Sequence, residues 1–164
     1  MSNPKDQPLL IDNPKLAEML TSGAFATIPH AQVLNLEYIS AEPYKAKIRL
    51  AYREELSGHL ETGIVHGGVL ISMIDSVCGM AVFCSLTKME PIATLDLRMD
   101  YLQSPAPYAD IIAEAECYKL TESIAFVRAW AYHHNPQDCI TASVATFMRQ
   151  SAGRALGPKA SQRS

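Results

Sequence analysis

The sequence has few features that would direct it to nucleic acid or to a metal. Lysine and arginine together number 14 against 17 aspartate and glutamate residues, a net charge of −3, so no general basic surface for nucleic acid is expected. No C-x-x-C pair is present, and no set of His, Cys and carboxylate residues has metal-ligand spacing. We therefore expect no metal and no cofactor. We also expect reduced, mostly buried thiols at Cys78, Cys84, Cys117 and Cys139.

Signals for export and membrane insertion are also missing. The N-terminus, MSNPKDQPLLIDNPK, has no long apolar segment, so we predict no secretory signal and a cytoplasmic protein. The apolar run 69–86 is long enough to cross a bilayer, but Asp75 and three serines interrupt it. Strand-like segments also flank this run. We therefore expect a helix surrounded by protein, and no membrane partner.

The pattern of apolar residues predicts one domain built from two helices and six strands. The short amphipathic helix is expected at 12–22 and the long apolar helix at about 67–87, after a polar loop at 53–65. Alternating segments predict strands at 33–40, 44–52, 92–102, 109–120, 123–134 and 139–150. We divide the chain into an N-terminal segment (1–29), the domain (30–150) and a small, polar, disordered tail (151–164).

These elements predict an α+β fold in which an antiparallel six-stranded sheet curls around the apolar helix. One sheet cannot cover a helix on every side, so the remaining apolar face predicts a partner subunit.

His133 and His134, beside Asn135 and Pro136, have the pattern of a solvated strand end.

The segment HGGVLISMID, residues 66–75, contains the candidate chemistry. Gly67 and Gly68 lie where the helix begins, and the first amide groups of a helix are free to bind an oxyanion. They can equally serve only to allow close helix–sheet packing. Asp75 is a carboxylate in an apolar helix, either a structural group bonded to a hydroxyl or a general base or nucleophile. His66 has no recognisable acidic partner, and we expect it to fix the turn.

The spacing between Gly67 and Asp75 predicts a site shared between subunits. Eight residues of helix separate them by about 12 Å along the axis, too far for one carbonyl group to contact both. Two antiparallel helices in a two-fold dimer would bring Gly67 of one chain near Asp75 of the other.

Two segments together resemble the hotdog-fold acyl-CoA thioesterases of the phenylacetate-pathway type, the PaaI-like group. These are GIVHGGVLISMIDSVCGMA and ATLDLRMDYLQSPA, and the resemblance covers about residues 30–150. It implies a curved sheet around one helix, homodimers that often pair again into tetramers, and hydrolysis of an acyl-CoA to the acid and coenzyme A. It implies Asp75 as base or nucleophile, Gly67 as oxyanion donor and His66 as part of the catalytic turn.

The same resemblance implies a supporting hydroxyl at Thr94, although alternation would place Thr94 on the polar face with Asp96, Arg98 and Asp100. Six residues before the histidine the family often has Asn or Gln, and here that position is Leu60. His59 or Glu61 could substitute for the missing amide. We expect Gly68, Val69 and Met73 to contact substrate, and Arg98 to lie where it could meet the coenzyme A phosphates.

Three functions other than acyl-CoA hydrolysis are compatible with a fold of this kind. A hotdog dehydratase would need a different turn, often with Pro-Gly, and none follows His66. A non-catalytic acyl-CoA-binding or regulatory protein is favoured by Leu60 and disfavoured by Asp75. A purely structural domain is the third.

Overall fold

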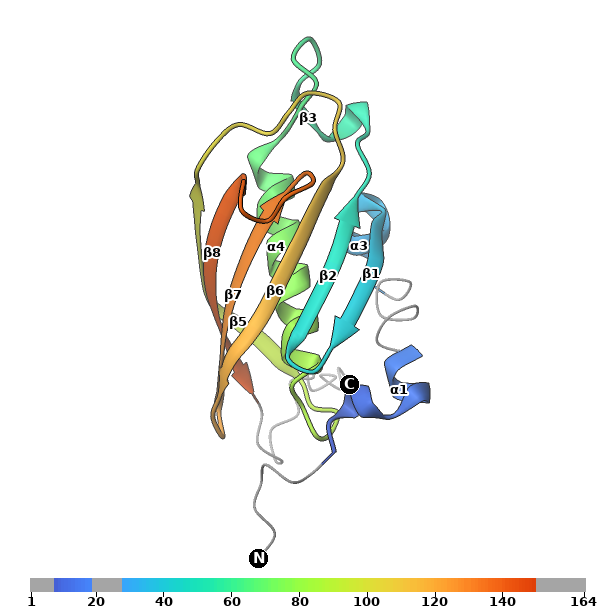
Figure 1. Cartoon of the computed structure of the whole chain (residues 1–164), viewed down its shortest axis with the longest axis vertical. Coiled ribbons are helices and arrows are strands. Elements are labelled where there is room, and N and C mark those ends of the chain that lie inside the picture. The colour runs from blue at the N-terminus through green and yellow to red at the C-terminus, as the bar shows by residue number, and fades with distance from the viewer. Residues whose placement is uncertain (1–7, 19–27, 150–164) are drawn as a thin grey trace, which may run out of the picture.

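The computed structural model describes residues 8–18 and 28–149, with one long helix at its centre (Figure 1). This helix, α4, spans Gly67–Phe83. Six antiparallel strands form one sheet in the order β1-β2-β6-β7-β8-β5. In chain order they are β1 (Leu36–Glu42), β2 (Lys45–Leu50), β5 (Ile92–Tyr101), β6 (Ile111–Leu120), β7 (Ile124–Tyr132) and β8 (Thr141–Arg149). The predicted α+β architecture is confirmed.

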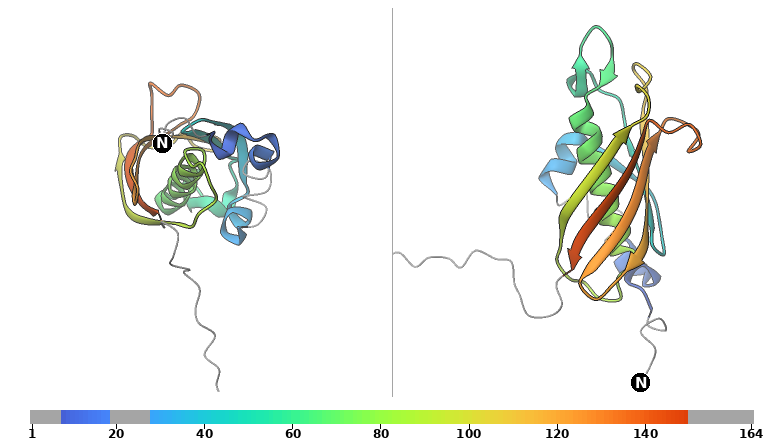
Figure 2. Two further views of the ribbon diagram at one scale, coloured as in Figure 1. Left: turned by 90° about the horizontal axis from the view of Figure 1, so that it is seen from below. Right: turned by 90° about the vertical axis from the view of Figure 1, so that its left-hand side faces the viewer.

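The sheet curves around α4, which lies in its concavity (Figure 2). Small side chains on the concave side allow the helix to lie close to the sheet. Fully buried alanines of this kind are Ala113, Ala115, Ala129 and Ala131. The helix fills the concavity with larger side chains, among them Leu70, Met73, Ile74 and Val77, each at most 1% exposed. Burial of this apolar surface is the main force that holds helix and sheet together.

Shorter elements revise the prediction at several points. β1 begins at Leu36, because the preceding residues form the helix α3 (Pro29–Leu34), which the alternation at 33–40 did not indicate. Pro29 begins this helix and Asn35, in the left-handed conformation with φ 52°, ends it. The predicted loop 53–65 is also structured. It contains a 3-10 helix, η4 (Glu54–Leu56), and a two-stranded hairpin of β3 (Ser57–His59) and β4 (Ile64–Val65).

The N-terminal helix predicted at 12–22 is described only in part. A 3-10 turn, η2 (Leu10–Asp12), precedes α1 (Pro14–Glu18), and the Asn13 side chain accepts a hydrogen bond from the Lys15 amide. Residues 19–22 and the tail 151–164 lie outside the described residues. Leu10 is buried, and its amide donates to the carbonyl of Leu86 beyond the end of α4.

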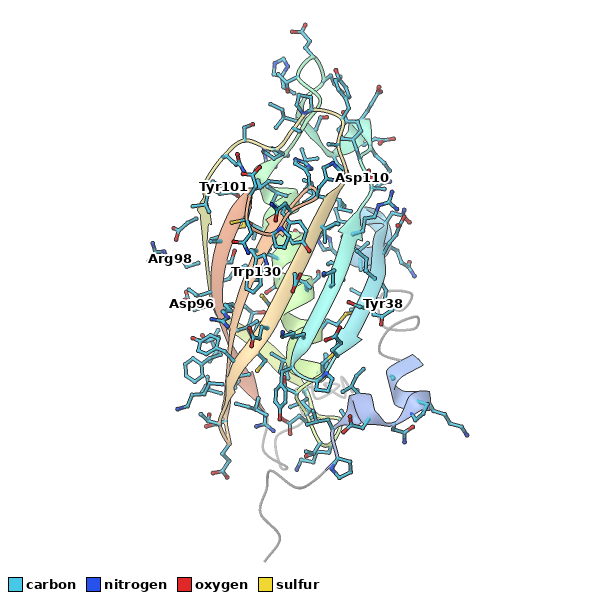
Figure 3. All side chains as sticks on the ribbon, viewed as in Figure 1. Tyr38, Asp96, Arg98, Tyr101, Asp110 and Trp130 are labelled. Carbon is cyan, nitrogen blue, oxygen red and sulfur yellow. The ribbon has the colours of Figure 1, made fainter. Side chains whose placement is uncertain are left out.

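A bulge in β5 changes which side chains face the helix. Thr94 pairs with Phe147 of β8, but Asp96 pairs with Thr146, so Leu95 is an extra residue in the strand. Strict alternation therefore fails, and the prediction that Thr94 shares a face with Asp96, Arg98 and Asp100 is wrong. Thr94 lies on the concave side with buried Phe147, whereas Asp96 and Arg98 project outward (Figure 3).

The four cysteines are free thiols, as predicted. Cys78, Cys84 and Cys117 are buried, and Cys139 is half-buried. Burial raises the pKa of Cys84 to about 12 and also raises the pKa of Cys78 and Cys117. These three thiols are therefore protonated at neutral pH and are poor nucleophiles.

Candidate active site

His66 caps the N-terminus of α4. Its Nδ1 accepts a hydrogen bond of 3.0 Å from the Gly68 amide, and its carbonyl oxygen accepts one from the Val69 amide. This agrees with the prediction that His66 fixes the turn. The Gly67 amide donates no hydrogen bond within the described part of the chain, so it is free to bind an oxyanion.

Tyr101, the last residue of β5, packs directly against this turn. Its hydroxyl donates a hydrogen bond of 3.0 Å to the carbonyl oxygen of Gly67. A Cβ atom at position 67 would lie only 2.9 Å from that hydroxyl. A side chain at position 67 would therefore require the Tyr101 ring or the turn to move. At Gly68 a Cβ atom would meet the capping Nδ1 of His66 at 3.0 Å.

Asp75 and Thr94 are brought together across the gap between α4 and β5. The Thr94 hydroxyl donates a hydrogen bond of 2.8 Å to Asp75 Oδ1. Asp75 is half-buried, and its second carboxylate oxygen accepts no hydrogen bond from any described residue. The carboxylate is thus held in one orientation with one oxygen available to a ligand.

A pocket of about 300 Å³ opens beside this carboxylate. Its lining comes from α4, β5, β8 and the start of α3, and it is mostly apolar: Ile28, His30, Asp75, Ser76, Gly79, Met80, Phe83, Ile92, Thr94 and Phe147. An apolar cavity with a few convergent polar groups is the usual form of a small-molecule site. Ile28, His30 and Phe147 were not among the predicted site residues, because their place depends on α3 and on the tertiary packing of β8.

Several residues predicted to bind substrate do not line this pocket. Met73 is fully buried, on the core side of α4. Val69 is partly buried against the core. His59, Leu60 and Glu61 are exposed around the tip of the β3–β4 hairpin.

Arg98 is also outside this pocket. Its side chain is 71% exposed and pairs with Asp100 at 3.1 Å, on the convex side of the sheet. Any contact between Arg98 and a phosphate would therefore be made at the outer surface.

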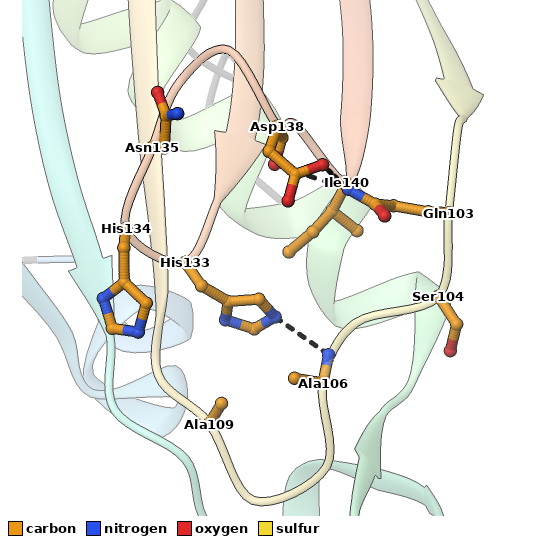
Figure 4. A pocket seen from close by; sticks show the side chains of 9 residues that line it. All are labelled: Gln103, Ser104, Ala106, Ala109, His133, His134, Asn135, Asp138 and Ile140. Atoms are coloured by element: carbon orange, nitrogen blue, oxygen red, sulfur yellow. Dashed lines mark hydrogen bonds between the residues drawn. The ribbon is translucent and has the colours of Figure 1, made fainter.

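A second hollow of about 340 Å³ contains no residue of α4 and lies at the β5–β6 and β7–β8 connections (Figure 4). His133 Nε2 accepts a hydrogen bond from the Ala106 amide, so the proton is on Nδ1, which donates to the carbonyl of Asp110. The interpretation of His133 as a solvated strand end is therefore incomplete, since it ties the two connections together. Gln103 donates to Asp138 Oδ1 at 2.7 Å across the same hollow.

Two further findings concern residues 8–18 and 28–149. No helix in these ranges has both the length and the apolar character needed to cross a membrane. The same ranges contain no group of three or more His, Cys, Asp or Glu residues arranged to hold a metal ion.

Comparison with known proteins gives consistent matches. A profile of the thioesterase superfamily matches residues 62–140. A putative esterase of Halobacterium salinarum is 33% identical over 94 residues, which are 56% of this chain and 61% of that protein, so the chain spans less than two thirds of its length. The medium/long-chain acyl-CoA thioesterase YigI of Salmonella typhimurium is 28% identical over 134 residues, 74% of this chain and 85% of that protein.

Solved structures match over most of the described residues. A protein of Pseudomonas aeruginosa with a known crystal structure is 36% identical in sequence, with a TM-score of 0.73. The match covers 81% of this chain and 98% of that protein's chain. A mutant of the phenylacetic acid degradation protein PaaI from Thermus thermophilus is 24% identical, with a TM-score of 0.65, covering 75% and 100% respectively. At that identity the likeness concerns the fold alone.

Proposed function

The chain belongs to the thioesterase superfamily and has the hotdog fold, and from this premise we propose that it hydrolyses an acyl-CoA thioester to the free acid and coenzyme A. One observation carries the proposal. A carboxylate, Asp75, is oriented by Thr94 in the lining of an apolar pocket, on a helix whose first amide is free.

In the proposed reaction, the thioester oxygen accepts a hydrogen bond from the Gly67 amide at the positive end of the α4 dipole. Asp75 takes a proton from water as the water oxygen attacks the carbonyl carbon, and the C–S bond then breaks. Coenzyme A leaves as the thiol when the proton reaches its sulfur. An oxyanion donor of this kind contributes about 100- to 1000-fold in rate, and a positioned base about 100- to 10,000-fold.

Direct attack by Asp75 is a second form of the same chemistry. It would give an acyl–Asp75 anhydride that water then cleaves. One turnover in ¹⁸O-labelled water separates the two forms. General-base catalysis puts the label in the released acid. With covalent attack, cleavage at the Asp75 carbonyl carbon leaves the label in Asp75.

We propose that the site is shared between two subunits. Gly67 and Asp75 lie on the same straight helix, about 12 Å apart along its axis, so one chain does not bring them to one carbonyl group. β5 is one of the two edge strands of the sheet and carries Thr94, so a second copy that pairs with this edge would lie beside Asp75. Such a two-fold homodimer would contain two equivalent sites, and dimers could pair again through another face.

Subunit mixing tests the shared site. Asp75→Asn and Gly67→Ala chains, each impaired alone, should regain up to about one quarter of wild-type activity after exchange, because half of the dimers are mixed and each has one intact site. No recovery, with exchange demonstrated by differently tagged chains, would contradict a shared site.

A non-catalytic acyl-CoA-binding protein is the alternative, and the observation that favours it is Leu60. This side chain is 71% exposed at the hairpin tip, where the resemblance led us to expect an amide. A thiol-release assay over a panel of acyl-CoAs distinguishes the two functions. Release of free coenzyme A by the wild-type protein supports hydrolysis, whereas saturable binding without release would support the alternative.

The four free thiols fit a reducing compartment, and we propose that the protein is located in the cytoplasm.

A further inference from the structure

We infer that Gly79 sets the length of the acyl chain that the protein accepts, a conclusion that rests on the proposed function and extends it to the substrate. Asp75, Gly79 and Phe83 are spaced four residues apart on α4, so they lie above one another on one face of the helix. All three line the same pocket. The pocket therefore extends from the carboxylate past Gly79, about 6 Å along the helix axis, to Phe83, about 12 Å along it.

The glycine at position 79 is not explained by backbone conformation. It lies in the interior of α4, where glycine is the least favourable residue after proline, and its φ angle is not in the left-handed region. A Cβ atom there would lie 3.8 Å from Ile92 Cδ1 and 3.8 Å from Phe147 Cε1, which is ordinary van der Waals contact. Gly67 differs, because a Cβ atom there would lie only 2.9 Å from the Tyr101 hydroxyl.

What the glycine provides is open space within the pocket. A Cβ atom at position 79 fits in contact with Ile92 and Phe147, two of the residues that line the cavity, so a longer side chain would take up space beside them. A leucine at this position would therefore fill the section of the pocket between Asp75 and Phe83. The absence of a side chain at Gly79 leaves this section available to a ligand.

The lining indicates the chemical class of the acyl group. Ile28, Met80, Phe83, Ile92 and Phe147 present hydrocarbon to the pocket, and the polar lining residues are His30, Asp75, Ser76 and Thr94. Such a pocket accepts an uncharged aliphatic or aryl chain and disfavours an acyl group with a second carboxylate. Its volume of about 300 Å³ is at the small end for ligand sites, which fits a chain of medium length.

The test is kcat/KM for saturated acyl-CoAs of increasing length with wild type, Gly79→Ala, Gly79→Leu and Phe83→Ala. Gly79→Leu should lower kcat/KM for the longest accepted chains by at least about 10-fold relative to the shortest, because each methylene in an apolar pocket is worth about that much. Gly79→Ala should shift the profile less in the same direction, and Phe83→Ala should shift it toward longer chains. A uniform loss over all lengths, or an unchanged profile in Gly79→Leu, would overturn the inference.

Binding separates this inference from the proposed function. Calorimetric titration of the same acyl-CoAs into Asp75→Asn and into Asp75→Asn/Gly79→Leu measures affinity without turnover. If Asp75→Asn/Gly79→Leu binds the longer acyl-CoAs more weakly but the shorter ones equally well, the role of Gly79 is supported. This holds even if the wild-type protein releases no coenzyme A, a result that would refute only the proposed hydrolysis. Equal affinities at every length would refute the role of Gly79 even if wild type hydrolyses them all.

Discussion

The Thr94 hydroxyl donates a 2.8 Å hydrogen bond to Asp75 Oδ1 and so joins the edge strand β5 to the central helix α4. The bulge at Leu95 makes this possible, because it places Thr94 on the concave side of the sheet while Asp96 and Arg98 remain outside. The bond leaves the other carboxylate oxygen of Asp75 available, which suits a base that must accept a proton from water.

Removal of this hydroxyl should impair catalysis more than folding. We expect Thr94→Val to lower kcat by about 10-fold or more, because a hydrogen bond to a charged group contributes about 1.5–3 kcal/mol. Thr94→Ser keeps the hydroxyl and should retain most of the activity. Steady-state kinetics and thermal unfolding of both variants make the measurement. Equal activity of Thr94→Val and wild type would show that the bond does not orient the carboxylate for reaction.

The contact between Tyr101 and Gly67 predicts a coupled pair of substitutions. Gly67→Ala would place a Cβ atom 2.9 Å from the Tyr101 hydroxyl, so the capped turn or the Tyr101 ring must shift and their hydrogen bond is disturbed, and we expect about a 10-fold loss of kcat/KM. Tyr101→Phe removes the clashing oxygen. The double variant should therefore be more active than Gly67→Ala alone, a non-additivity that a double-mutant cycle measures. Strictly additive losses would show that the hydroxyl is not what requires glycine at this position.

The buried ion pair Arg149–Glu90 should support stability and not catalysis. Arg149 Nε lies 2.6 Å from Glu90 Oε1, with side chains only 14% and 6% exposed, and Arg149 also donates to the Thr121 carbonyl. Arg149→Ala should lower the free energy of unfolding by about 3–5 kcal/mol, because Glu90 would remain buried without its partner. Denaturant unfolding measures this change.

The exposed pair Arg128–Glu116 is the matched control for that experiment, with side chains 55% and 26% exposed. Arg128→Ala should cost at most about 1 kcal/mol. Similar losses in the two variants would contradict the importance of burial.

Acid should remove a small contribution of Asp110 to the stability of the fold. The Tyr52 backbone amide and the Arg49 guanidinium hold the pKa of this carboxyl below its ordinary value of 3.8. Because the folded-state pKa is the lower one, the stabilisation is present above pH 3.8 and is lost as the pH falls through the folded-state value. Asp110→Asn should thus be slightly less stable than wild type at neutral pH. The difference should shrink as the pH falls below 3.8 and disappear below the folded-state pKa, as urea unfolding at several pH values would show. A difference that grows in acid would reverse the assigned direction.

The sequence predicted secondary structure well where the apolar residues of a segment followed one regular pattern. The alternation of buried and exposed residues in β2, β6 and β7 located those strands to within a few residues, and the long apolar run located α4. α3 was not predicted, because Val33 and Leu34 extended the alternating pattern of β1 into what is a helix. The bulge at Leu95 is likewise invisible to a pattern that assumes two residues per repeat.

The site was predictable at its helix and much less so elsewhere. His66 and Gly67 begin α4 and Asp75 lies on the same helix eight residues after Gly67, so their spacing alone indicated a turn and a carboxylate. Tyr101 lay within a predicted strand, but nothing in the sequence linked it to Gly67. The pocket lining from α3 and β8 depends on tertiary packing, which explains why Met73 was expected in place of residues such as Phe147.

The central claim is that the Asp75 carboxylate catalyses thioester hydrolysis, and the rate of coenzyme A release by Asp75→Asn tests it most directly. Asn has nearly the same shape and can still accept the Thr94 hydrogen bond, but it cannot take a proton from water. We predict that kcat/KM for acyl-CoA falls by at least about 100-fold while acyl-CoA affinity changes little. Release by Asp75→Asn at the wild-type rate would contradict the account.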